Sequence, residues 1–409
     1  MRVRTSTPSR QVSRPAKTIV LVSSALFLAA CSAFGASGND EVAGPDATAP
    51  AGSESGPCPA NVVVQADWFP EVEHGGTYQL IGPGGTIDKD AFTYSGPLRN
   101  RYKGAHGVQT IEIRSGGAAV DNQSVTDLMY ADKDILFGFV NTDDAIAAVL
   151  DNKPVIGVVG SLDVNPQMLM WSPARFSISD FNDLRRTKAP VLHFPGMTYV
   201  DFLVSQGYIS AEQLDATYGG DPSRWLKSRG DVIQQGFATN EVYTYTNVLE
   251  EWKRPVDFFL IHWMGYENYP AMMTIRTDQL NAQRACLDLL VPTLQRAWVE
   301  FLNEPTEVAD TLVAINETFD TFFSITPDLN KQAIAMFSEF ELATNGSDQV
   351  YGNFDPERVN RLFDIVKGIY AGRDTPLPAT LVAADVYTNA FIDDEVGLTP
   401  QPAGESSGS

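Results

Sequence analysis

The sequence predicts an α/β fold in which largely parallel strands are covered by helices. Short runs rich in β-branched and aromatic residues alternate with amphipathic runs from residue 61 onward, and this alternation is typical of a parallel sheet. The hydrophobic share of 44% supplies a substantial core. About 340 residues lie between two ends of low complexity, which is enough for two ordinary domains.

The expected strands follow one another along the chain, each ended by turn residues. In order, they are 61–66, 110–114, 134–140, 154–160, 191–194 and 256–263. A short helical run follows the third of these strands, at 145–152, and another follows the fifth, at 199–207. Two longer amphipathic helices are expected over 278–302 and 305–324.

The first 31 residues have the layout of a bacterial export signal. Five basic residues precede an apolar run, 18–30, which is too short to span about 30 Å of hydrocarbon as a helix. The run ends in Leu-Ala-Ala-Cys, which resembles a bacterial lipobox and implies lipid attachment at Cys31. An ordinary secretory signal with a chance cysteine is the alternative. We therefore expect a signal peptide over 1–30 and an extracytoplasmic protein, lipid-anchored to the outer face of the bacterial cell membrane.

The segments at the two ends of the expected fold cannot bury a core. Residues 31–57 are rich in Gly, Ala, Ser, Pro and acidic side chains, and 396–409 have a similar composition. Such compositions are typical of flexible chain. We expect a tether at the first and a disordered tail at the second.

The charge of the mature chain excludes one class of partner. After removal of residues 1–30, 24 Lys and Arg face 51 Asp and Glu, a formal net charge of −27. A protein of this charge is repelled by nucleic acid and by anionic lipid. We expect no nucleic-acid partner.

Two further cysteines, Cys58 and Cys286, remain after the lipobox. Outside the cytoplasm such a pair can form a disulfide, and two free thiols are the alternative. No Cys-x-x-Cys pair or Cys/His cluster occurs, and the chain has only four histidines. We therefore expect no metal site.

Polar and aromatic residues follow the first expected strand. Asp67, Glu71 and Glu73 offer hydrogen-bond acceptors, and Trp68 offers a flat apolar face. Ligands bind at the carboxyl ends of strands in open α/β sheets. The alternative is a surface loop with a half-buried tryptophan.

Two segments resemble motifs of type II periplasmic binding proteins related to thiamine-pyrimidine-precursor-binding proteins. The first motif, D-W-x-P-x-x-x-H-x-G-x-Y, is matched by Asp67, Trp68, Pro70, His74, Gly76 and Tyr78. The second, Gly-x-x-x-(Ser/Asn)-Glu-Pro-Tyr, resembles residues 236–243, where Val242 replaces the proline. The order of elements also agrees from about residue 60 to about 325.

The resemblance implies two α/β lobes joined by two crossing strands, with a ligand cleft between the lobes. The first lobe would comprise 58–160 and 263–395, and the second lobe 161–262. The crossing strands would lie near 158–163 and 258–263. The resemblance further implies the solute-binding protein of an ABC importer, a monomer without a cofactor that delivers a small molecule to the permease and ATPase subunits.

The expected ligand contacts come from both lobes. Trp68 and Tyr78 would stack on the ligand, and two strand-to-helix turns would add helix N-termini and cap residues. The remaining expected ligand-binding residues are Asp67, His74, Asn141, Thr142, Gly196, Thr198, Asn240 and Glu241.

The ligand class follows from the charges in these segments. Residues 65–78, 138–144, 194–199 and 234–246 contain no Lys or Arg. A small aromatic heterocycle, such as a thiamine pyrimidine precursor or a riboflavin-like molecule, therefore fits better than sulfonate or nitrate. Three alternatives remain: a binding protein for a small anion, a secreted enzyme like the pyrimidine-precursor synthase branch, and a surface interaction protein without a transported ligand.

Overall fold

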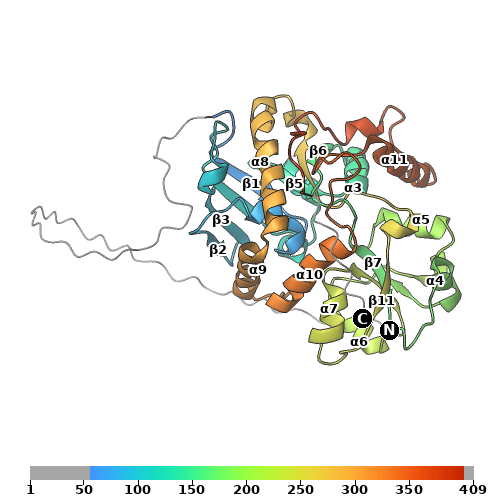
Figure 1. Cartoon of the computed structure of the whole chain (residues 1–409). Helices are drawn as coiled ribbons and strands as arrows, with labels where there is room; N and C mark the ends of the chain where they lie inside the picture. Colours follow the sequence, from blue (N-terminus) through green and yellow to red (C-terminus); the bar gives the residue numbers. More distant parts are fainter. Residues whose placement is uncertain (1–55, 400–409) are drawn as a thin grey trace, which may run out of the picture. The chain divides into compact units, whose positions relative to one another are not determined.

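The computed structural model describes residues 56–399. The predicted signal peptide, Cys31 and all but the last two residues of the predicted tether lie outside the described residues. Figure 1 shows two β-sheets with helices packed against them. This mixed architecture confirms the predicted α/β fold with two lobes.

The larger sheet has seven strands in the order β2-β3-β4-β1-β5-β12-β6. β1 pairs in parallel with β4 and β5, whereas β12 runs antiparallel to β5 and β6. We call this sheet and the helices packed on it the first lobe. Its strands are β1 (Asn61–Gln65), β2 (Thr86–Asp88), β3 (Thr93–Pro97), β4 (Thr110–Arg114), β5 (Ile135–Val140), β6 (Val155–Val159) and β12 (Met272–Arg276).

The second sheet has five strands in the order β11-β7-β10-β8-β9, and we call it and its helices the second lobe. β7 runs antiparallel to both β11 and β10, while β8 lies parallel to β10 and β9. Its strands are β7 (Gln167–Trp171), β8 (Val191–Leu192), β9 (Leu214–Asp215), β10 (Ile233–Phe237) and β11 (Asp257–Leu260).

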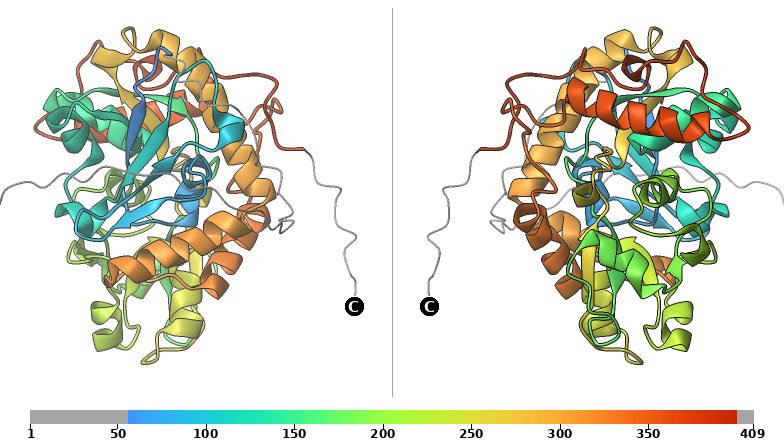
Figure 2. Two further views of the ribbon diagram at one scale, coloured as in Figure 1. Left: turned by 90° about the vertical axis from the view of Figure 1, so that its left-hand side faces the viewer. Right: turned by 90° about the vertical axis from the view of Figure 1, so that its right-hand side faces the viewer.

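The helices differ widely in length. The longest, α8 and α11, each have one buried and one exposed face, as expected of amphipathic helices. Figure 2 shows α9 and α11 on opposite sides of the first sheet. The α-helices are α1 (Gly75–Tyr78), α2 (Val125–Ala131), α3 (Thr142–Ala147), α4 (Phe181–Thr187), α5 (Thr198–Ser205), α6 (Ser223–Ser228), α7 (Glu241–Tyr243), α8 (Arg284–Asn303), α9 (Thr306–Phe319), α10 (Pro327–Glu339) and α11 (Pro356–Ala371).

Two glycines bring α1 into close contact with α8. A Cβ atom on Gly75 would lie 2.2 Å from the ring of Phe301, and one on Gly76 would lie 2.2 Å from the ring of Trp298. No side chain fits at such a distance, so the close approach requires glycine. The contact fixes the segment that contains His74.

Two segments, 160–166 and 261–271, connect the sheets, and we call them the first and second connection. The predicted crossing strands are strand only in part, because 158–159 belong to β6 and 258–260 to β11, and the residues that follow are irregular. The strand expected at 256–263 ends at Leu260, and the 3-10 turn η7 (His262–Met264) follows, closed by Gly265 at φ 98°. The first connection contains Pro166, which has no backbone N–H to donate to a neighbouring β-strand. The boundaries predicted for the lobes stay a prediction.

Cys58 and Cys286 form a disulfide that joins the start of the fold to α8. At the other end, part of the predicted tail belongs to the fold. The backbone oxygen of Val396 accepts a hydrogen bond from the backbone N–H of Tyr351. The side-chain amide of Asn345 donates to the backbone oxygen of Leu398 and accepts from its N–H. No helix among residues 56–399 is long and apolar enough to cross a membrane.

Candidate functional site

The loop after β1 places Asp67 and His74 in direct contact. The Nε2 atom of His74 lies 2.8 Å from Oδ1 of Asp67, and the imidazole stacks on Phe139 of β5 with ring centroids 4.6 Å apart. His74 is 1% exposed, and its Nδ1 atom is enclosed without a hydrogen-bond partner among residues 56–399. Asp67 and His74, both of the first motif, thus lie together near the carboxyl end of β1.

Further carboxylates from the same loop surround this pair. Burial raises the pKa of Glu71 well above its usual value, and the charges of Glu73, Asp67 and Glu241 raise it further. Within the part of the chain that the structure describes, no hydrogen bond or ion pair engages the Glu71 carboxylate. Glu73 is buried, and burial raises its pKa too, although its carboxylate accepts a hydrogen bond from Thr239. This hydrogen bond joins the first lobe to the second.

The second lobe contributes Glu241 at the start of α7. Its carboxylate accepts hydrogen bonds from the backbone N–H of Phe237, at 2.8 Å, and from the hydroxyl of Tyr218, at 3.1 Å. Burial nevertheless raises the pKa of Glu241 to about 7, and the charge of Glu73 adds to the effect. A Cβ atom at Gly236 would lie 2.9 Å from the carboxylate carbon, so the glycine leaves room for it.

The turn between β5 and α3 completes the group with two aspartates. Asp143 is buried, and burial raises its pKa. Asp144 is exposed, and desolvation by nearby protein together with the charges of Asp143 and Asp67 raises its pKa to about 7. We use the term acidic cluster for Asp67, Glu71, Glu73, Asp143, Asp144 and Glu241.

Asn141 and Thr142 form hydrogen bonds with the second connection, and their contact with a ligand stays a prediction. The Asn141 side chain accepts a hydrogen bond from the backbone of Ala271 and donates one to Asp144. The Thr142 hydroxyl is buried against the backbone of Tyr269, with which it shares hydrogen bonds. Asp144, which the sequence analysis did not select, is the member of this turn that stays accessible.

Trp68 lies in an aromatic cluster that includes residues of both lobes. Its indole contacts Phe194 of the second lobe edge to face, with centroids 6.1 Å apart, and it contacts Phe322 and Phe323 in the same manner. Phe322 is 52% exposed. Trp68 is half-buried beside the acidic cluster and marks the place where the lobes meet.

The other predicted ligand residues are less clearly part of this group. Tyr78 is buried in the core and stacks on Tyr94. Thr198 is the first residue of α5 and is buried, and the helix cap is Met197. Gly196 is exposed with φ 81°, a conformation that favours glycine. Asn240 precedes Glu241 and accepts a hydrogen bond from the hydroxyl of Thr244.

Comparisons with known proteins support the architecture. No family model and no curated protein matches the chain. Among solved structures, the ligand-binding component of an ABC-type import system from Staphylococcus aureus, solved with zinc bound, is 11% identical, with a TM-score of 0.51 over 83% of this chain and 100% of its own. The aliphatic sulphonate-binding protein of Escherichia coli is also 11% identical (TM-score 0.51, 85% and 99% covered), and the alkanesulfonate-binding protein of Xanthomonas axonopodis is 9% identical (TM-score 0.52, 81% and 99% covered).

The chain has the periplasmic-binding-protein fold. In periplasmic binding proteins, the two lobes close around a ligand by a hinge motion. The acidic cluster and Trp68 lie where the lobes of this fold meet, since Glu73 bonds Thr239 and Trp68 contacts Phe194 across the boundary. The residues between the lobes are therefore the candidate ligand site.

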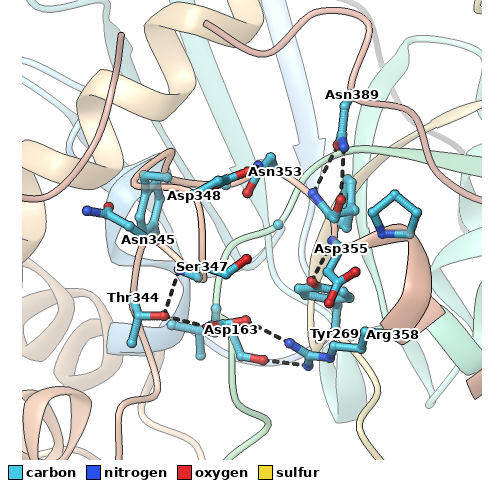
Figure 3. Close-up of a pocket in the computed structure, with 17 residues that line it drawn as sticks. Asp163, Tyr269, Thr344, Asn345, Ser347, Asp348, Asn353, Asp355, Arg358 and Asn389 are labelled. Atoms are coloured by element: carbon cyan, nitrogen blue, oxygen red, sulfur yellow. Dashed lines mark hydrogen bonds and ion pairs between the residues drawn. The ribbon is translucent and has the colours of Figure 1, made fainter. Parts of the chain in front are cut away.

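A cavity lies elsewhere, at the two connections (Figure 3). It has a volume of about 360 Å³ and is bordered by both connections, the segment 344–355 and the start of α11. Its polar side chains bond one another or the backbone: Asp163 pairs with Arg358, and Asn389 bonds the backbone of Phe354. We call it the hinge cavity. Among residues 56–399, no group of three or more His, Cys, Asp or Glu is arranged to hold a metal ion.

Proposed function

We propose that this protein is the extracytoplasmic solute-binding lipoprotein of an ABC importer, anchored through Cys31, and that it captures a small aromatic heterocycle that carries a positive charge. It would act as a monomer and deliver the ligand to a permease and its ATPase. The observation that carries the proposal is the acidic cluster between the lobes, beside Trp68, in which no carboxylate forms an ion pair with a Lys or Arg of residues 56–399.

Electrostatics favours a cationic ligand at this place. The groups that raise the pKa values of Glu71 and Asp144 are other carboxylates, and no Lys or Arg is among the causes of these shifts. Crowded carboxylates without a counter-charge are unstable when ionised, and an opposite charge within a few ångströms restores their ionised form. A protonated amine or amidine between the lobes would supply that charge, whereas sulfonate or nitrate would add repulsion.

Trp68 favours an aromatic ligand. Indole is the side chain that best binds flat rings and cations through its face. A thiamine pyrimidine precursor with an aminomethyl group supplies both a ring and a positive charge, whereas a riboflavin-like molecule supplies the ring alone. Closure of Phe194 and Glu241 of the second lobe over such a ligand would complete the site.

Thermal unfolding of the purified protein with a panel of ligands tests the proposal. The aminomethyl and hydroxymethyl forms of the thiamine pyrimidine precursor are a matched pair that differ in charge, and riboflavin, ethanesulfonate and nitrate complete the panel. A ligand at 100 times its Kd stabilises the folded state by about 2.7 kcal/mol. We expect the aminomethyl form to raise the midpoint most. A shift with ethanesulfonate or nitrate alone would overturn the assignment of the ligand class.

The variant Glu241→Gln connects the shift to the site. It removes one charge of the acidic cluster while its amide oxygen can still accept the hydrogen bond from Phe237. We expect it to reduce the shift caused by the aminomethyl form. Asp310→Asn, an exposed carboxylate on α9, is the matched control and is expected to leave the shift unchanged.

A further inference from the structure

A single buried arginine on α11 bonds both connections. Arg358 as a whole residue is 7% exposed. Nη1 donates to the carboxylate of Asp163 at 2.7 Å, and Nη2 donates to the backbone oxygen of the same residue, in the first connection. Nε donates to the backbone oxygen of Glu267 at 2.7 Å and Nη2 to that of Asn268 at 3.0 Å, both in the second connection. Figure 3 shows this side chain between Asp163 and Tyr269.

The same guanidinium lies flat on an aromatic ring of the second connection. Its central carbon is 3.7 Å from the centre of the Tyr269 ring. The hydroxyl of Tyr269 in turn accepts a hydrogen bond from the backbone N–H of Asp355, beside the start of α11. Arg358 is therefore held from several directions, and the path of the second connection depends on it.

The second connection in turn holds the turn that contains Asp143 and Asp144. The side-chain amide of Asn268 donates to one oxygen of Asp143 at 2.8 Å, and the hydroxyl of Tyr266 donates to the other at 2.9 Å. The backbone of Tyr269 bonds Thr142, the residue before Asp143. Two of the residues involved, Asn268 and Tyr269, directly contact Arg358.

We propose that Arg358 is a positioning residue for ligand binding: it fixes the spacing of the two connections and, through Asn268 and Tyr269, the placement of Asp143 and Asp144 at the candidate site. The assignment of a ligand to that site rests on the proposed function, whereas the control of lobe spacing does not. The planar fork of arginine matches this role, because lysine offers a point charge that cannot reach several acceptors in one plane while stacking on a ring.

The test compares Arg358→Lys with a matched control on the same helix. Arg361 lies about one turn further along α11, its side chain is exposed, and it pairs with the carboxylate of Glu267 at 3.0 Å. Arg361→Gln therefore removes a contact to the second connection but keeps the hydrogen bonds of Arg358 to both connections. We expect Arg358→Lys to bind the aminomethyl pyrimidine at least about tenfold more weakly, and Arg361→Gln to bind it as the parent does.

A spectroscopic readout separates positioning from a purely structural role. Spin labels at Ala211→Cys and Asp310→Cys, two exposed positions on different lobes, report the distance between the lobes in the full chain with Cys31→Ser. The native cysteines Cys58 and Cys286 are paired and stay unlabelled. Without ligand, we expect Arg358→Lys to broaden the distance distribution and Arg361→Gln to leave it unchanged.

The outcomes distinguish the two proposals. If Arg358→Lys lowers the unfolding midpoint but leaves both affinity and lobe distance unchanged, Arg358 has a structural role only and the inference is wrong. If the pyrimidine binds neither the parent protein nor Arg358→Lys, the proposed ligand class is wrong. The lobe distances measured without ligand then still decide the role of Arg358. Should Arg358→Lys not fold, Asp163→Asn removes the charge of the partner and is expected to broaden the distances as well.

Discussion

The side-chain amide of Asn165 donates a hydrogen bond to the side-chain oxygen of Asn268 across 2.9 Å, and this bond joins the first connection to the second. Both side chains are 2% exposed. Asn268 also donates to Asp143 of the acidic cluster. The two connections and the candidate site thus share one buried network of hydrogen bonds.

We expect Asn268→Ala to destabilise the protein by about 1–3 kcal/mol, because it leaves buried polar groups of Asn165 and Asp143 without a partner. Chemical denaturation with urea measures the loss. Asn360→Ala is the control, since the Asn360 side chain is exposed on α11 and bonds only the backbone of its own helix. Equal losses in the two variants would contradict the importance of the network.

We expect Trp68→Ala to weaken binding of the aminomethyl pyrimidine by about 5- to 30-fold, which corresponds to about 1–2 kcal/mol for a cation near an indole. Titration calorimetry measures the affinity, and circular dichroism verifies the fold. Trp263→Ala provides a control, because Trp263 is 43% exposed at η7 and contacts Phe258 and Phe340 instead. Unchanged affinity in Trp68→Ala would remove the stacking role.

Stability of the empty protein is expected to fall between about pH 4 and pH 7. Burial raises the pKa of Glu241 to about 7, and desolvation with neighbouring charges does the same for Asp144. In the unfolded chain these groups have pKa values of about 4. A raised pKa stabilises the folded state below pH 4, and this contribution is lost as the pH rises through 7. Thermal unfolding across the pH range measures the decline, and Glu241→Gln should make it shallower.

Binding of a cationic ligand should show the opposite dependence on pH. The ligand binds best to ionised carboxylates, so affinity is expected to rise from pH 5 to pH 8, by about tenfold per unit for each proton displaced. Calorimetry in buffers of different ionisation enthalpy would detect the released protons. Affinity that is independent of pH would argue against a contact with Glu241 or Asp144.

Two glycine variants should have opposite effects. Gly76→Ala places a Cβ 2.2 Å from the Trp298 ring, and we expect it to destabilise the protein by about 1–3 kcal/mol. Gly368→Ala, within α11, meets no atom within 4 Å and is expected to stabilise the helix by about 0.5–1 kcal/mol. Urea denaturation measures both. Comparable stability of the two variants would show that α1 can move away from α8.

The sequence analysis located strands rich in β-branched or aromatic residues, among them β4 with its alternating polar residues, and it missed β7, β10 and β12, which contain several Met or Gln residues. β5 and β6 are predicted because every residue in them is apolar or glycine. β10 was missed because Gln234 and Gln235 are buried in it. Gln234 bonds the hydroxyl of Tyr245, while Gln235 accepts from Tyr199 and from the backbone of Phe194. Such partners are distant in sequence and cannot be inferred from local composition.

The candidate site shows the same limit. Asp67 and His74 stand close in the sequence, and a motif resemblance identifies them. The bond between Glu73 and Thr239 joins residues 166 positions apart, which only the arrangement of the lobes reveals. Asp144 was not selected from the sequence because it is adjacent to Asp143, and adjacent side chains do not generally face one another; the structure engages Asn141 and Thr142 of the same turn with the second connection.

The disulfide between Cys58 and Cys286 has a mechanical consequence. β1 is an inner strand of the first sheet, with β4 on one side and β5 on the other, and it begins three residues after Cys58. A force applied to the chain before Cys58 is transmitted through the disulfide to α8. The hydrogen bonds between β1 and its neighbouring strands therefore do not carry the whole force. The load therefore enters the molecule through the first lobe, which contains both cysteines, and not through the second.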